Sequence, residues 1–278
     1  MLLCVPLVSC CQSIAQKQYT LKKESPNIIL FSAITSVIAM CFFVITSGFE
    51  LNFVPALVPY ALCFAVCYAS AWVGTVFAVR YGLMAISNLI ISCSLIFPTI
   101  YGIALGESVT PAVVVGIILL LMSFVLVNLK FDSKDSFSIK WFVCVMIAFA
   151  GNGVCSIMQN MQKRALGDSY THEFMIIALA AASAMLLLLA LVTSKDIKGD
   201  LLGCLMYSAG NGIANAIVNL LMIIIIGNIP NTILYPTNSA LGMAFMFLLS
   251  FIVYKERFSK MQYIGYVLGI VSIVLLNI

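Results

Sequence analysis

Charge is scarce in this sequence. Asp, Glu, Lys and Arg make up 9% of its 278 residues, whereas hydrophobic residues make up 63%. Soluble domains carry roughly one quarter charged residues, and a water-soluble fold of this length cannot bury so much apolar surface. A helical bundle in a bilayer can, because lipid is the solvent for its outer faces. We therefore predict an integral membrane protein, with the lipid bilayer as a partner.

The sequence also lacks the side chains that metal sites and common enzymes need. Its single histidine, His172, has no companion, and none of its ten cysteines forms a CxxC pair, which argues against a metal site and against disulfides. It contains no nucleotide-binding loop, HExxH or GxSxG motif. The net charge of +4 lies between apolar runs, so no nucleic-acid partner is indicated. We expect no enzyme, no metal and no cofactor.

Apolar runs occupy most of the chain and are separated by turn or charge signals. A spanning helix needs roughly 20 apolar residues, and the alternating segments of a membrane barrel are absent. The predicted fold class is an all-α integral membrane protein with ten transmembrane helices, a multi-pass protein of the plasma membrane. The predicted spans are 2–16, 27–46, 56–78, 82–105, 112–129, 140–162, 172–192, 200–226, 230–254 and 261–278.

The two halves of the chain resemble each other. Residues 106–129 and 255–278 align without a gap at an offset of 149. With five spans in each half, the halves enter the membrane in opposite senses, an arrangement typical of secondary transporters. We predict two inverted five-helix repeats, 1–129 and 140–278; chance similarity of two apolar helices is the alternative. The aligned pairs include Glu107 and Glu256, Gly116 and Gly265, and Ser123 and Ser272.

Basic residues are distributed unevenly between the connections. Twelve Lys and Arg residues lie in the odd-numbered connections, and only Lys163 and Arg164 lie in the even-numbered ones. Cytoplasmic loops carry the excess of positive charge. The odd-numbered connections are therefore predicted to face the cytoplasm, with both termini outside.

The last helix of each half carries a resemblance to a known family. The stretches ALGESVTPAVVVGIILLLMSFVLV and VYKERFSKMQYIGYVLGIVSIVLL each place a Glu in a short turn before a helix that contains Gly. Together with the repeat, they resemble the EamA-like branch of the drug/metabolite transporter superfamily over essentially the whole chain. The resemblance implies a carrier or exporter of a small metabolite, with a central cavity between the halves. Many ten-helix relatives place both termini in the cytoplasm, opposite to the orientation predicted here.

Glu107 and Glu256 have two interpretations. A carboxylate in the turn before a helix accepts backbone N–H bonds and complements the helix dipole, which we favour. The alternative is a gating or coupling residue. No acidic residue lies in the middle of a predicted span, and proton-coupled export of cations normally needs one.

The expected function is therefore secondary transport of a small neutral or zwitterionic metabolite by alternating access, performed by a monomer. A lipid-intermediate flippase of the same superfamily is the alternative. It would need a basic headgroup site, for which only Lys163, Arg164 and Arg80 are available.

Uncharged polar residues inside the spans indicate a site. Asn211, Asn215 and Asn219 recur every four residues, so they share one drifting helix face. An amide facing lipid is costly when unpaired, so this face points inward, either to a solute cavity or to hydrogen bonds that join helices. The candidate substrate-binding residues are Tyr68, Trp72, Asn88, Asn152, Gln159, Asn211, Asn215, Tyr235 and Asn238.

Glycines and prolines within the spans suggest local packing and kinks. Gly151 and Gly153, and likewise Gly210 and Gly212, flank an asparagine and are interpreted as points of close helix packing. Pro98 and Pro236 are expected to kink their helices.

Overall fold

The computed structural model describes residues 1–22, 27–81, 90–91, 93–128, 139–193, 197–252 and 259–276. In this part of the chain the regular structure is helical, apart from an isolated bridge between Ile226 and Ile229. The all-α class is therefore confirmed. The α-helices are α1 (Cys4–Lys22), α2 (Ile28–Thr46), α3 (Val58–Tyr81), α5 (Ile96–Ala104), α6 (Pro111–Asn128), α7 (Ile139–Leu166), α8 (Thr171–Thr193), α9 (Ile197–Ile225), α10 (Asn231–Ile252) and α11 (Lys260–Leu276).

Several helices have the length and composition of membrane spans. Five segments of the described residues qualify, and many of their exposed side chains are apolar; Val192, for example, is 84% exposed. Apolar faces of this kind are stable in lipid, which fits a membrane protein. The five segments are Ile28–Thr46, Pro55–Thr75, Ile139–Leu166, Asp168–Thr193 and Gly203–Ile225.

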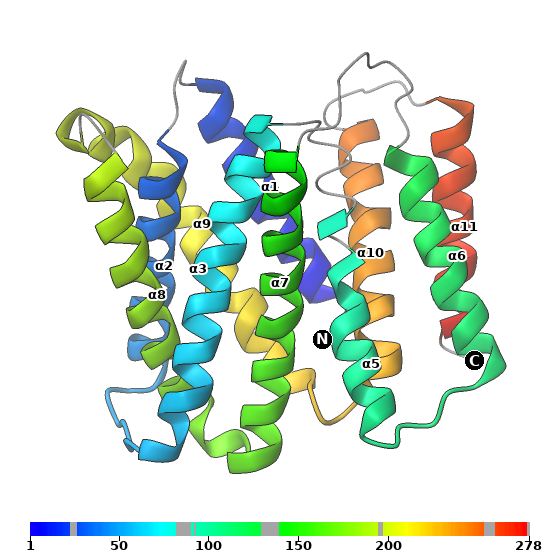
Figure 1. The fold of residues 1–278 in the computed structure, drawn as a ribbon, viewed down its shortest axis with the longest axis horizontal. Helices are drawn as coiled ribbons and strands as arrows, with labels where there is room; N and C mark the ends of the chain where they lie inside the picture. Colours follow the sequence, from blue (N-terminus) through cyan, green and yellow to red (C-terminus); the bar gives the residue numbers. More distant parts are fainter. Residues whose placement is uncertain are drawn as a thin grey trace.

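Consecutive helices run in opposite directions through the bundle (Figure 1). The turn from α5 to α6, which contains Ser108, lies at the lower end of the view, together with the ends of α7 and α9. We call this end the Ser108 end. The start of α11 at Lys260 lies at the opposite end, with the starts of α2, α7 and α9, and we call it the Lys260 end.

Helices far apart in sequence form the main contacts. α3 packs against α7 and α8, while α9 packs against α1 and α2. α2 packs against α8, α6 against α11, and α10 against α1, α5 and α11. The chain is thus one interleaved bundle, in which helices of the first predicted repeat contact helices of the second.

The contact between α6 and α11 contains a reciprocal pair of hydrogen bonds. The Ser123 Oγ of α6 donates to the Gly265 carbonyl of α11. The Ser272 Oγ of α11 donates to the Gly116 carbonyl of α6, at 2.9 Å. All four residues are buried. The two acceptors, Gly116 and Gly265, align with each other in the sequence repeat, and so do the two donors, Ser123 and Ser272.

Two predicted spans differ from the helices observed. α1 continues beyond the apolar run to Lys22, because Tyr19 is 2% exposed and stacks on Phe31 with ring centroids 4.7 Å apart. In the run at 82–105, residues 82–89 and 92 lie outside the described residues. A 3-10 turn precedes α5, so Pro98 stands in the first turn of that helix and not in the middle of a long one. Proline lacks the N–H of an interior helical residue and is tolerated in a first turn. Pro236 does lie inside α10.

Three of the four flanking glycines lie at close helix contacts. A Cβ atom at Gly151 would lie 2.7 Å from the Cys67 carbonyl oxygen of α3. Gly153 faces the Phe97 ring, and Gly212 faces Ile38 and the Thr35 backbone of α2. At Gly210 a Cβ would meet nothing within 4 Å. The close-packing interpretation is confirmed except at Gly210.

Candidate solute site

A chain of amides crosses the bundle between α7, α9 and α3. The Gln159 Nε2 of α7 donates to the Asn219 Oδ1 of α9 at 2.9 Å. The Asn219 Nδ2 donates to the Asn215 Oδ1 one turn earlier, at 2.6 Å. The Asn215 Nδ2 then donates to the Tyr68 hydroxyl of α3, at 2.7 Å. Gln159 and Asn215 are buried, at 5% and 4% exposed. The structure thus links three predicted site residues, Gln159, Asn215 and Tyr68, through Asn219.

Aromatic rings continue the site along α3. The Tyr68 ring meets the Trp72 ring at a centroid distance of 6.3 Å and an angle of 62°. On its other side Tyr68 stacks on Phe64, at 5.8 Å and 18°. Trp72 is half-buried and presents an apolar face with one N–H donor. The site thus combines hydrogen-bonding amides with an aromatic wall.

Asn152 lies on the inner face of α7 and is nevertheless exposed. At 100° per residue, it points in nearly the same direction as Gln159, which is buried against α9. The exposed apolar residues of α7, such as Val143 at 49% and Ile147 at 44%, lie on other sides of the helix. Asn152 is therefore exposed on the side of α7 that carries Gln159, about 10 Å along the helix from it at a rise of 1.5 Å per residue.

The other predicted site residues lie apart from this chain of amides. The Asn211 Nδ2 donates to the Thr35 Oγ1 of α2 at 3.2 Å, and both residues are 0% exposed. Asn211 therefore joins α9 to α2. Asn238 is half-buried on α10, and its Oδ1 has no hydrogen-bond partner in the described part. Asn88 lies outside the described residues.

Tyr235 forms a second polar pair with a residue that the sequence analysis missed. The Asn160 Nδ2 donates to the Tyr235 hydroxyl at 2.7 Å and to the Ser156 carbonyl at 2.9 Å. Asn160 is 0% exposed, and its Oδ1 has no hydrogen-bond partner among the described residues. The sequence did contain a signal for Asn160: it is an amide in an apolar helix, directly after Gln159 and on the adjacent helix face.

Glu107 stabilises a different helix from the one expected. Its Oε2 accepts the backbone N–H of Thr232 at 2.9 Å, and its Oε1 accepts the Asn231 Nδ2 at 2.9 Å. Both partners lie in the first turn of α10. The helix after Glu107, α6, is capped instead by the preceding residue, Thr110, whose Oγ1 accepts the N–H of Val113 at 3.3 Å. The prediction of a helix-capping role is therefore correct in kind, but its target is α10. Glu256 lies outside the described residues.

Lys163 stabilises the end of α9. Its Nζ donates to the Ile223 and Ile224 carbonyls at 2.7 and 3.0 Å, and it pairs with Asp168 at 2.8 Å. A cation near the C-terminal carbonyls of a helix complements the helix dipole. Because Gln159 and Lys163 both contact α9 near the end of α7, the two helices meet at the Ser108 end (Figure 1).

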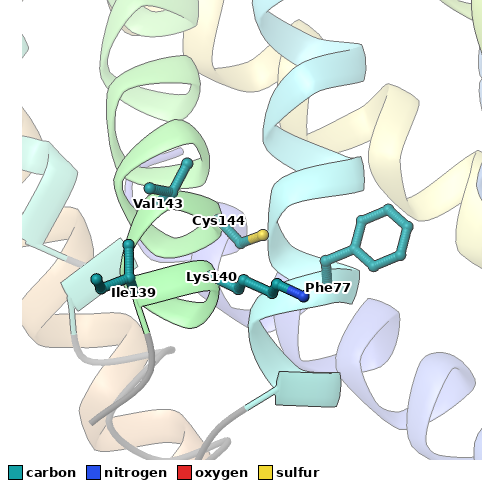
Figure 2. A pocket seen from close by; sticks show the side chains of 5 residues that line it. All are labelled: Phe77, Ile139, Lys140, Val143 and Cys144. Atoms are coloured by element: carbon teal, nitrogen blue, oxygen red, sulfur yellow. The ribbon is translucent and has the colours of Figure 1, made fainter.

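A shallow groove lies between α3 and the start of α7 (Figure 2). It is lined by Phe77, Ile139, Lys140, Val143 and Cys144. Only Lys140 has a polar side-chain tip among these apolar residues, so the groove lacks the donors and acceptors that bind a polar solute.

Comparison with known proteins supports the fold alone. No family model matches the sequence, and no curated protein matches it either. The chain is similar to a crystal structure of a protein with 16% sequence identity and a TM-score of 0.71, and the match covers 99% of this chain and 98% of that one. The arrangement of helices therefore recurs as an entire fold.

Proposed function

We propose that this protein is a secondary transporter that moves a small neutral or zwitterionic metabolite across the plasma membrane by alternating access. In this proposal the chain is a monomer with ten spans in two inverted five-helix repeats, and it is an EamA-like member of the drug/metabolite transporter superfamily. The amide site between the repeats binds the solute.

The pattern of helix contacts supports the inverted repeat. Let α1 correspond to α7, α2 to α8, α3 to α9, α5 to α10 and α6 to α11. The contact of α3 with α7 then corresponds to that of α9 with α1, and the contact of α2 with α9 to that of α8 with α3. The contact of α1 with α10 corresponds to that of α7 with α5. Such reciprocity is what a two-fold axis between two related halves produces.

The reciprocal serines support the same axis at the level of single residues. Ser123 and Ser272 align in the repeat, and so do Gly116 and Gly265. Each serine donates to the glycine of the other half. A mutual arrangement of this kind is typical of an isologous contact, and it supports related halves over chance similarity of two apolar helices.

The observation that carries the proposed function is the amide chain between the halves. Tyr68 comes from the first half, whereas Gln159 and Asn215 come from the second. No acidic side chain takes part in the described hydrogen bonds that link Gln159, Asn219, Asn215 and Tyr68. The neutral donors and acceptors of the amide chain suit a solute without net charge, and the exposed Asn152 gives the site a polar approach.

The flippase alternative is less well supported. A phospholipid-like headgroup would need free basic side chains in the bundle. Lys163 is bound to two carbonyls of α9 and to Asp168, and Arg164 lies 3.6 Å from Glu107. Arg80 has no described side chain. Lys163 thus serves as a helix-end contact, and Arg164 lies beside a carboxylate.

A counterflow experiment tests the proposal. The purified protein is placed in liposomes loaded with pools of unlabelled neutral, zwitterionic, cationic or anionic metabolites, and uptake of the matching labelled compounds is followed. We expect exchange with a neutral or zwitterionic pool, and its loss in Asn215→Leu, because the leucine removes the donor to Tyr68.

The variant must remain monodisperse in detergent to be informative. Normal exchange by a folded Asn215→Leu protein would place the site elsewhere, and exchange with the cationic or anionic pool alone would contradict a solute without net charge.

A further inference from the structure

A contact at the Ser108 end joins the two halves that alternating access requires to move apart. Glu107 lies in the turn between α5 and α6, in the first half. Its partners Asn231 and Thr232 begin α10, in the second half. The contact spans more than 120 positions in sequence, since Asn231 is 124 residues from Glu107. The Ser108 end cannot open between these elements while the contact persists.

We propose that the Glu107 carboxylate is a latch that holds the Ser108 end closed, and that its release from the first turn of α10 opens the solute path at that end. This inference rests on the proposed function, because a latch has a role only where two ends open in turn. It adds to that function the residue that controls one of the two ends.

The geometry of the carboxylate suits this role. One oxygen accepts a backbone N–H at the start of α10, where the helix dipole favours negative charge. The other oxygen accepts the Asn231 amide. Only 12% of the Glu107 side chain is exposed, and hydrogen bonds to an ionised group are about twice as strong as neutral ones.

Arg164 adds little to this contact. It lies 3.6 Å from the Glu107 Oε1, and 46% of its side chain is exposed. Exposed ion pairs of this kind contribute little to stability. The bonds to the first turn of α10 are therefore the main part of the latch.

Gly102 makes room for the latch. A Cβ atom at this position would overlap the Glu107 carboxylate and would lie 2.9 Å from the Asn231 Cβ. The Gly102→Ala substitution therefore displaces the carboxylate without changing any charge. It offers a second way to release the latch that is independent of the chemistry at position 107.

The chain also provides a matched control at the same end. Lys163 contacts the end of α9 and Asp168, and all of these residues belong to the second half. Asp168→Asn removes an ion pair at the Ser108 end that does not connect the halves. It should leave the opening of this end unchanged.

Labelling of Asn152→Cys with a membrane-impermeant maleimide tests the latch. The reagent is applied to oriented vesicles from the Ser108 end or from the Lys260 end, and mass spectrometry of the peptide assigns the label to position 152. With Glu107 and Gly102 intact, we expect reaction from the Lys260 end. Adding Glu107→Gln or Gly102→Ala should raise reaction from the Ser108 end by about fivefold or more, a typical size for coupling between sites, and Asp168→Asn should not.

The outcomes separate the latch from the proposed function. Unchanged reaction from the Ser108 end in folded Glu107→Gln and Gly102→Ala proteins overturns the latch and leaves the transporter intact. No reaction from either end in the protein with the latch intact overturns the aqueous site itself. If one of the two variants fails to fold, the other decides.

Discussion

At the scale of single residues, the asparagines of α9 have different roles although they share one helix face. Asn215 and Asn219 belong to the amide chain, whose members contact three helices. Asn211 is fully buried against Thr35. The spacing of four residues predicted the common face but not this division, because each role depends on which helix lies opposite.

Two substitutions distinguish these roles. Asn211→Ala should lower the stability of the folded protein by roughly 0.6–2 kcal/mol, the range for hydrogen bonds between membrane helices, and should leave the KM for the solute unchanged. Tyr68→Phe keeps the ring but removes the acceptor of Asn215, so it should raise the KM roughly two- to tenfold, since a hydrogen bond contributes about 0.5–1.5 kcal/mol.

Thermal unfolding in detergent and counterflow kinetics measure both quantities for each variant. A raised KM in Asn211→Ala with normal stability would reverse the assignment.

At the scale of helices, the sequence predicted most boundaries within a few residues because apolar runs and their breaks are local signals. α2, for instance, was expected at 27–46 and occupies Ile28–Thr46. The exceptions depend on distant contacts. α1 extends to Lys22 because Tyr19 packs on Phe31, and Glu107 binds α10 because folding brings α10 beside the turn. Neither contact can be derived from the local sequence.

Glycine is necessary at one position of the bundle, where α3 meets α7, and optional at another, on α9. At Gly151 a Cβ would lie 2.7 Å from the Cys67 carbonyl oxygen, so Gly151→Ala should destabilise the protein by about 1–3 kcal/mol, the usual range for overpacking. At Gly210 a Cβ meets nothing within 4 Å. Gly210→Ala should therefore be neutral or should stabilise the helix by up to about 1 kcal/mol.

The measurement is the midpoint of thermal unfolding for the two alanine variants beside the unmodified protein. Equal effects at both positions would contradict the close approach of α3 and α7 at Gly151.

At the scale of the whole molecule, the sequence repeat and the reciprocal helix contacts are two different kinds of evidence for related halves. The alignment pairs Ser123 with Ser272 by position, whereas the fold pairs each with a glycine of the opposite half. Sequence similarity alone contains no information about which helices touch. The orientation of the bundle in the membrane, in turn, follows from charge and not from the fold.

Thiol labelling from one side of the membrane tests the orientation of the bundle. Twelve Lys and Arg residues belong to the odd-numbered connections and two to the even-numbered ones. Of the twelve, Lys140 and Lys260 stand in the first turns of α7 and α11, at the Lys260 end. This end should therefore face the cytoplasm. Lys260→Cys and Ser108→Cys replace exposed residues at opposite ends. Lys260 is preferable to its neighbour Ser259, whose Oγ accepts the Gln262 N–H at 3.3 Å and so helps to begin α11.

In intact cells a membrane-impermeant maleimide should label Ser108→Cys and spare Lys260→Cys, and permeabilisation should make Lys260→Cys reactive. Because the substitution removes only one of twelve basic residues, it leaves the charge asymmetry in place. Labelling of Lys260→Cys but not of Ser108→Cys in intact cells would show the opposite orientation, and the latch at Glu107 would then control the cytoplasmic end.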